Sequence, residues 1–281
     1  LLPTLRENGI DIIWVMPCQP IGVITRKGTL GSYYSIIDYC AINPEFGTRK
    51  DFEHFLKEAH KQGFKVILDW VANHTAPDSE WTKNDGWHYR DSLGNLMVQY
   101  DWTDISKLNY ENQDMRAEML KAMHWWMDSI GIDGFRCDMA EMVPAAFWSY
   151  ATKAVKEQYP DIQFIGEVYN PSLYRSYISA GFDLLYDKVG MYDTMRAVIT
   201  GQAATSAITS AWQQTDDIRQ HMLYFLENHD EQRIASTFFA GEARRGVPAM
   251  MASMLMQQNP FMLYFGEEYG ERGMDHEGFS G

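Results

Sequence analysis

Positive charge and cysteine are both scarce in this chain of 281 residues. Only 24 Lys and Arg stand against 38 Asp and Glu, which gives a formal net charge of −14. Nucleic acid and anionic membrane surfaces repel so acidic a chain unless its basic residues cluster, and no basic run here exceeds two residues. The three cysteines, Cys18, Cys40 and Cys137, contain no Cys-x-x-Cys pair. This argues against a disulfide framework and against a cysteine zinc site.

Long hydrophobic runs are also lacking. None approaches the ~20 consecutive apolar residues of a membrane helix, and the first residues contain no basic segment followed by an apolar one, as a signal peptide would. We therefore expect neither nucleic acid nor a membrane as a partner, and the compartment stays open among cytoplasm, periplasm and secretion. Aromatic residues, by contrast, are plentiful at 14%. Most should be core, while exposed ones are natural platforms for sugar rings.

Short apolar runs alternate with longer segments of helical period, which predicts repeated βα units around a parallel sheet. Each run is nearly continuously apolar, as in strands that are buried on both faces. The seven runs are residues 10–16, 64–69, 132–138, 162–167, 182–186, 222–228 and 261–266.

Two helices can be predicted in more detail. Between the first two runs, Thr48 and Asp51 resemble a capping box and Gly63 ends the helix. A second helix carries apolar residues at spacings of three and four from Met115 to Ile130, a stripe that should pack on the sheet.

The segment of residues 75–110 interrupts the alternation of apolar runs and helices. This segment is long, polar and rich in Asp, Asn, Gly and Trp, and loops of this length are usually functional.

Acidic residues close several of the apolar runs. Four runs end in acids: Asp69, Asp138, Glu167, and the cluster Glu227-Asn228-His229-Asp230. The carboxyl ends of the strands in a parallel barrel lie at one end of the barrel, and like charges gathered there lower stability. Their presence therefore indicates a functional role. Such a group is suited to stabilising a cation, for example the oxocarbenium-like transition state of glycosidic bond cleavage.

These strand ends resemble the α-amylase family of glycoside hydrolases, a group of retaining enzymes that act on α-glucosidic bonds. Four segments resemble the family's conserved regions, in the family's order: Asp69-Trp-Val-Ala-Asn73-His74, Gly134-Phe-Arg136-Cys-Asp138, Gly166-Glu167-Val-Tyr169 and Glu227-Asn228-His229-Asp230. Further matches are Gly9 to Pro17, Tyr34 to Tyr39, Pro44 to Thr48, Lys107-Leu108-Asn109 and Tyr264 to Glu268. The resemblance covers essentially the whole chain.

The resemblance implies a TIM (β/α)8 barrel with a short excursion after the third strand. The predicted domains are the first part of the barrel at 1–74, the excursion at 75–110 and the second part of the barrel at 111–281. Against the family's order, the first strand and the last helix are missing. We therefore expect the natural protein to be longer at both ends, which mass spectrometry of the native protein would check.

The resemblance also implies roles for three acids. Asp138 would be the nucleophile that forms a glycosyl enzyme, Glu167 the general acid and later the general base, and Asp230 the holder of sugar hydroxyls. Glu167 must carry a proton to act as an acid. Its negative neighbours favour the protonated form, whereas Arg136, two residues before Asp138 on the same strand face, favours the ionised nucleophile.

Substrate-binding roles follow in the same way. The resemblance implies that His74 and His229 hydrogen-bond the sugar at the cleavage point and that Tyr34 stacks on its ring. Arg136 joins this substrate-binding set, while Asp69 would support it structurally.

The sequence departs from the family near the nucleophile. Many relatives carry a histidine four residues after it, whose backbone helps hold a calcium ion, preceded by a lysine that touches the leaving sugar. Here Met142 and Glu141 stand in those places, although Asn73, another calcium ligand of the family, is kept. We predict no metal ligand and no required cofactor, and a structural calcium stays an open alternative.

The main hypothesis is a hydrolase of α-1,4-linked glucans or maltooligosaccharides, weakly favoured by Lys107-Leu108-Asn109, which resembles the form in neopullulanases and cyclomaltodextrinases. Alternatives are a glucanotransferase, an enzyme acting on α-1,6 bonds, sucrose or trehalose, and an inactive binding subunit. A metal hydrolase is disfavoured because no His-x-x-x-His spacing is present. The motifs leave hydrolysis against transfer, endo against exo action and the oligomeric state undetermined.

Overall fold

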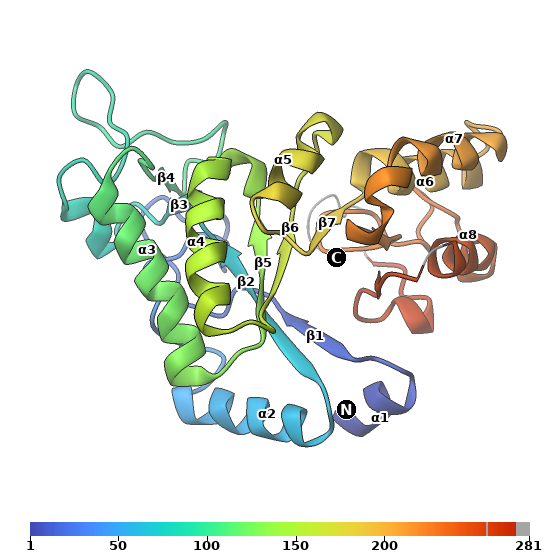
Figure 1. Cartoon of the computed structure of the whole chain (residues 1–281), viewed down its shortest axis with the longest axis horizontal. Coiled ribbons are helices and arrows are strands. Elements are labelled where there is room, and N and C mark those ends of the chain that lie inside the picture. The colour runs from blue at the N-terminus through green and yellow to red at the C-terminus, as the bar shows by residue number, and fades with distance from the viewer. Residues whose placement is uncertain (257, 274–281) are drawn as a thin grey trace. The chain divides into compact units, whose positions relative to one another are not determined.

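A computed structural model describes residues 1–256 and 258–273 of the chain (Figure 1). The chain divides into two compact units. Unit 1 holds Leu1–Glu167 with Ser179–Phe182, and unit 2 holds Val168–Ile178 with the chain from Asp183 onward. The division of the chain into 1–74, 75–110 and 111–281 stays a prediction.

Unit 1 is built on four parallel strands. They are β1 (Ile12–Val15), β2 (Lys65–Val71), β5 (Gly134–Asp138) and β6 (Gln163–Gly166), each paired with the next. Every residue of β5 is buried, as are all of β2 except Lys65, which explains their continuous apolar character. Because the strands are parallel, the residues that follow them emerge at one edge of the sheet.

The helices of unit 1 agree with the predicted patterns. They are α1 (Leu2–Glu7), α2 (Arg49–Lys61), α3 (Gln113–Trp125) and α4 (Ala145–Gln158), with short helical turns at Glu80–Lys83, Trp126–Ile130 and Ala140–Met142. The capping box at the start of α2 is confirmed. Thr48 accepts a bond from the Asp51 amide, and the Asp51 carboxylate accepts one from the Thr48 amide at 2.7 Å. Gly63, just beyond α2, has a left-handed φ of +83°.

The predicted apolar stripe runs through α3 into a π-helical turn. Met115, Met119 and Met123 are buried on α3, and Trp126 and Ile130 are buried on the turn that follows it. The Trp126 indole donates to the backbone oxygen of Tyr39 at 2.7 Å, so the stripe also satisfies a buried polar group.

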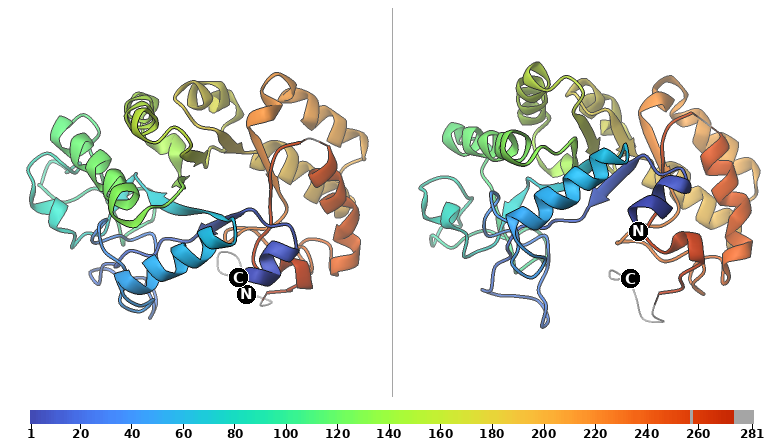
Figure 2. Two further views of the ribbon diagram at one scale, coloured as in Figure 1. Left: turned by 60° about the horizontal axis from the view of Figure 1, so that its bottom comes forward. Right: turned by 90° about the horizontal axis from the view of Figure 1, so that it is seen from below.

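A short antiparallel pair of strands, which we call the neck, joins the two ends of the excursion. Strand β3 (His74–Thr75) pairs with β4 (Ser106–Lys107) just beyond β2. The loop after β1 runs beside the excursion (Figure 2), where Lys27 bonds to the Asp101 backbone oxygen and Thr25 to that of Thr103. The excursion is thus tied to unit 1 at its base and along one side.

Unit 2 continues the βα pattern. Its strands are β7 (Leu184–Tyr186), β8 (Met222–Phe225) and β9 (Phe261–Met262), and both β7 and β9 pair parallel with β8. Its helices are α5 (Tyr174–Ser179), α6 (Asp193–Ile199), α7 (Ser206–Gln214) and α8 (Ala243–Leu255), with short turns at Pro171–Leu173, Lys188–Tyr192, Asp216–His221 and Glu267–Tyr269. All seven runs predicted to be strands therefore contain one.

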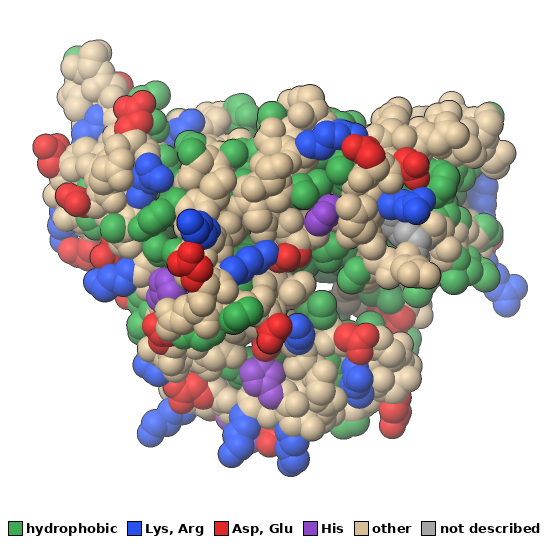
Figure 3. Space-filling model, viewed as in Figure 1, with side chains coloured by type: hydrophobic (Ala, Val, Ile, Leu, Met, Phe, Trp, Pro, Cys, Tyr) green, Lys and Arg blue, Asp and Glu red, His purple; other side chains and the backbone are tan. Residues whose placement is uncertain are grey.

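The surface shown in Figure 3 mixes basic and acidic side chains, with no broad basic area on that face. Among the residues that the model describes, no helix has the length and apolar character needed to cross a membrane.

Candidate active site

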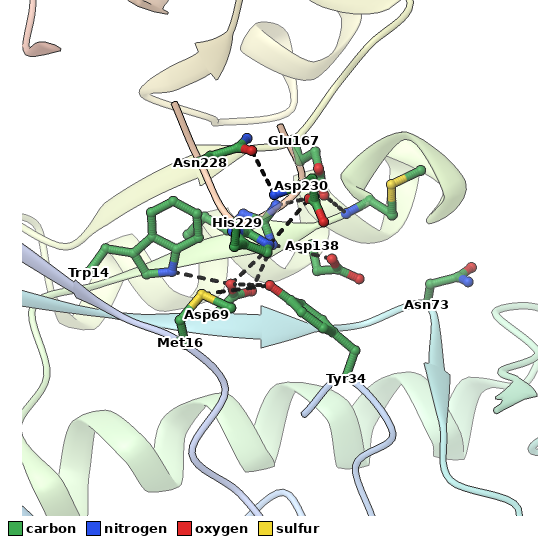
Figure 4. A network of polar contacts seen from close by, with 12 residues as sticks. Trp14, Met16, Tyr34, Asp69, Asn73, Asp138, Glu167, Asn228, His229 and Asp230 are labelled. Carbon is green, nitrogen blue, oxygen red and sulfur yellow. Dashed lines mark hydrogen bonds and ion pairs between the residues drawn. The ribbon is translucent and has the colours of Figure 1, made fainter. Parts of the chain in front are cut away.

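Acids from three neighbouring strands of unit 1 meet at one buried guanidinium. Arg136 of β5 is fully buried and lies 2.9 Å from Asp69 at the middle of β2, 3.2 Å from Asp138 at the end of β5, and 2.8 Å from Glu167 just beyond β6. Asp69 and Arg136 are register partners on neighbouring strands, and Arg136 and Asp138 share a face of β5 because they are two residues apart. The parallel register therefore places a cation among three acids. The three acids, Asp69, Asp138 and Glu167, are labelled in Figure 4.

Asp69 is a buried acceptor rather than an exposed acid. Besides Arg136, the Trp14 indole and the Tyr34 hydroxyl donate to its Oδ2, at 3.2 and 3.0 Å. Burial raises the pKa of Asp69 to about 6, although the charge and hydrogen bond of Arg136 pull it back down. These contacts hold Asp69 beneath the other two acids and support its expected structural role.

Glu167 is held by the backbone that follows Asp138. The Met139 amide donates to Glu167 Oε2 at 2.7 Å, and Met139 adopts a left-handed φ of +41°, which is unusual for a residue with a side chain. Backbone strain of this kind persists only where its surroundings fix it, and it is common at functional sites. Glu167 and Asp138 are both buried, with relative exposures of 2% and 7%. The two carboxylates are therefore largely desolvated and fixed relative to one another.

His74 and Tyr34 stand next to this cluster. His74 is buried, with Nε2 3.2 Å from the Tyr34 backbone oxygen and Nδ1 3.2 Å from the Asn73 amide. Burial lowers the pKa of His74 to about 4, so its ring is neutral at physiological pH. On its outer side the ring meets Trp102 edge to face at 5.9 Å, and Trp102 in turn meets the exposed Tyr100 at 5.3 Å. An aromatic path thus leads from His74 to the surface of the excursion.

His229 and Asp230 form their own group in unit 2, on the turn after β8. His229 Nε2 lies 3.2 Å from Asp230 Oδ2, and the side-chain oxygen of Asn228 accepts bonds from the Asp230 and Glu231 amides at 2.8 and 2.9 Å. About a third of the Asp230 side chain is exposed, compared with about a tenth for His229. Asp230 is therefore a fixed, solvent-accessible carboxylate within its own unit.

Of the family's calcium ligands, Asn73 is kept, whereas Met142 replaces the histidine that many relatives carry four residues after the nucleophile. No group of three or more His, Cys, Asp or Glu side chains in the described part of the chain could hold a metal ion. The Asn73 amide lies against the His74 ring, and Glu141 and Met142 occupy a short helical turn after β5. The described side chains thus supply only part of the family's calcium donor set, and the absence of a metal requirement stays a prediction.

The sequence predicts all three acids of the cluster but not all of their partners. Arg136 was expected to favour ionisation of Asp138, yet it contacts Glu167 at least as closely, so it does not by itself distinguish the two. For Trp14, the sequence pattern predicts only a place in a strand. Its place next to the strand's end was the one available signal that its indole N–H could face Asp69.

Comparison with known proteins agrees with this arrangement. The family model described as alpha amylase, catalytic domain, matches residues 2–85 and 82–279, and the chain belongs to this family. The chain is 30% identical to alpha-amylase MalA of Haloarcula japonica over 97% of its own length and 41% of that protein. It is 26% identical to neopullulanase 2 of Thermoactinomyces vulgaris over 97% of its length and 48% of that protein.

Among solved structures, an alpha-amylase from Lactobacillus plantarum superimposes with a TM-score of 0.87 at 31% identity, covering 99% of this chain and 69% of that one. The fold is accordingly the predicted (β/α)8 barrel type of this family. The chain spans about half the length of the curated relatives it matches.

Proposed function

We propose that this chain carries the catalytic barrel of a retaining glycoside hydrolase that cleaves α-1,4-glucosidic bonds in α-glucans or maltooligosaccharides. The main support is the meeting of Asp69, Asp138 and Glu167 at Arg136, with Asp138 and Glu167 at the strand ends where such barrels carry their chemistry. Membership of the alpha-amylase catalytic-domain family adds to it.

The proposed reaction has two steps. In the first, a carboxylate oxygen of Asp138 forms a bond to the anomeric carbon while the glycosidic oxygen leaves with the proton of Glu167. In the second, Glu167 takes a proton from water, and the water oxygen displaces Asp138 to release the sugar. Arg136 keeps Asp138 ionised before the attack, and its hydrogen bonds fix where the carboxylate points.

The remaining residues bind the sugar. We assign His74, whose ring is neutral at physiological pH, and His229 to hydroxyl recognition. The half-buried Tyr34 ring is assigned to stacking, and Asp230 to holding hydroxyls through its partly exposed carboxylate. Hydrogen bonds to sugar hydroxyls that strengthen in the transition state contribute several kcal/mol to glycosidases. Trp102 and Tyr100 extend this surface outward, which suits a substrate of several sugar units.

The Asp138→Asn variant tests the proposal. It removes the nucleophile while keeping the side chain's size, so turnover of maltoheptaose should fall by at least ~10³-fold, because covalent catalysis depends on this group. Asp161→Asn, which changes an exposed acid between α4 and β6, is the matched control and should keep its activity. Intact turnover in Asp138→Asn would overturn the assignment.

The product profile of the same reaction separates the alternatives. Glucose and short maltooligosaccharides from maltoheptaose would fit hydrolysis. Exclusive formation of longer oligomers would instead show a glucanotransferase and exclude the hydrolase. A fully inactive chain that still bound maltoheptaose would favour a binding subunit, although all three acids are kept.

A further inference from the structure

The turn that follows β8 in unit 2 is closed by a side chain at its base. Glu227 begins the turn, and its carboxylate accepts bonds from two residues at the far end. Oε1 accepts from the Ile234 amide at 2.5 Å and Oε2 from the Arg233 guanidinium at 3.0 Å. Glu227 is buried, with 1% exposure. One carboxylate therefore joins the two ends of an eight-residue segment, with Asp230 at its middle.

Arg233 extends this closure to the next strand. The same NH1 that bonds Glu227 also donates to the Phe265 backbone oxygen, at 2.9 Å, just beyond β9. The guanidinium lies 4.3 Å from the centre of the Tyr264 ring, and only 8% of the residue is exposed. An acid, a carbonyl and an aromatic face thus contact this buried cation, and each contact favours the charged form. Together they hold the guanidinium in one position.

The middle of the turn is fixed by other groups. Asn228 accepts from the Asp230 and Glu231 amides, and the Glu231 carboxylate accepts from the Tyr192 hydroxyl at 3.0 Å and pairs with Lys188 at 3.3 Å. Asp230 itself is held through its backbone and its neighbours. Its position therefore depends on where the base of the turn is anchored.

We propose that Arg233 is a positioning residue for Asp230: by tying Glu227 to the end of β9, it sets where the turn presents the Asp230 carboxylate to the sugar. The proposal rests on the proposed role of Asp230 in the reaction. Arg233 does not touch the substrate in this scheme, and its effect passes through the backbone of the turn.

A second buried acid, Glu267, lies on the turn that follows β9. Only 5% of it is exposed, and its Oε2 accepts from the Tyr264 amide at 3.0 Å. Burial, with a further contribution from the Glu227 charge, raises the pKa of Glu267 to about 8, against lowering by Arg233. The charged groups that act on Glu267 and Glu227 are Arg233, Glu268 and Glu271. The Glu267 carboxyl therefore favours its protonated form at neutral pH, and the carboxylate that contacts Arg233 is that of Glu227.

The test compares Arg233→Met with Arg175→Met. Arg175 forms an exposed guanidinium pair with Asp217 in the same unit, away from the turn, and is the matched control. Arg233→Met should lower kcat/KM for maltoheptaose by about 10²-fold, since a misplacement of about 1 Å has that effect on catalysis. The loss should disappear in an Asp230→Asn background, because Arg233 then has nothing left to position. A loss equally large in that background would overturn the proposal.

Hydrogen exchange supplies a readout that does not depend on activity. Amides of residues 228–232 should exchange faster in Arg233→Met and at the normal rate in Arg175→Met. Unchanged exchange would also overturn the proposal. If Arg233→Met does not fold, Arg233→Lys, which keeps the charge but loses the planar fork, takes its place in both measurements. Full activity of Asp230→Asn alone would instead reject the proposed role of Asp230, with exchange still deciding on Arg233.

Discussion

Individual residues in the acid cluster of unit 1 have unequal tasks. Asp138 and Glu167 are buried and lie at the ends of their strands. Asp69 instead lies within β2, and its carboxylate oxygens accept hydrogen bonds from Arg136, Trp14 and Tyr34. The result is one acid that organises the site and two that are left for chemistry. This difference follows from position along the strand, since all three are carboxylates of similar strength in water.

Replacing the organising acid should cost both stability and activity. Asp69→Asn leaves the fully buried Arg136 short of a charge partner, and breaking a buried pair in this way costs about 3–5 kcal/mol of unfolding free energy. Urea denaturation at pH 7 measures the loss, with Asp161→Asn again as the control. A variant as stable as the parent would show that Asp138 and Glu167 alone compensate the guanidinium.

At the scale of the element, the neck of the excursion combines a short antiparallel pair with buried imidazoles. Thr75 of β3 contacts His88 Nε2 at 2.9 Å, and burial, with a smaller contribution from Arg90, lowers the pKa of His88 to about 4. His74 on the same strand has a pKa lowered to a similar value. The neck therefore excludes protons that the unfolded chain would bind.

This exclusion makes the neck sensitive to acid. The pKa of His88 is about 4 when folded and near 6.5 when unfolded, so the unfolded state gains protons first and stability is lost as the pH falls through this interval. His88→Gln should therefore lose less unfolding free energy between pH 7 and pH 4 than the parent. The difference between the two proteins isolates His88, because His74, Asp69 and the other titrating groups are common to both. Parallel pH curves would contradict the prediction.

The element formed by β9 and its following turn should respond to pH in the reverse sense. Glu267 has a folded pKa of about 8 against an ordinary value of 4.5, so the folded state holds its proton more tightly and unit 2 loses stability as the pH rises through that range. Glu267→Gln removes the titration. Its unfolding free energy should vary less than the parent's between pH 5 and pH 8, as measured by urea denaturation. An unaltered pH dependence would show that another group is responsible.

For the molecule as a whole, strands were easier to predict from the sequence than partners. Seven apolar runs, a capping box and the stripe from Met115 to Ile130 are patterns of local period, and each corresponds to an element. The Arg136 cluster was partly predictable because parallel strands bring their ends together. The Glu227, Arg233 and Glu267 cluster was not, since its members come from two segments whose contact depends on tertiary packing rather than on spacing.

Tolerance of the whole chain to insertion should differ sharply between the excursion and the helices. Insertion of Gly-Ser-Gly-Ser after Gly94, at an exposed turn, should lower the unfolding free energy only slightly, because each doubling of loop length costs about 0.6 kcal/mol. Maltoheptaose turnover should stay unchanged. The same four residues after Ala122, on the buried face of α3, should prevent folding. Thermal unfolding compares the two, and equal effects would contradict the prediction.

The pairing of β3 with β4 has a consequence for descent. Because His74 and Thr75 are held opposite Lys107 and Ser106, the chain between them can lengthen, shorten or change composition while both of its ends stay where they are. Selection can then remodel the excursion, where the proposed substrate surface includes Trp102 and Tyr100, by small inherited steps without disturbing the acids on the neighbouring strands. A neck two residues wide thus separates what must be kept from what is free to diversify.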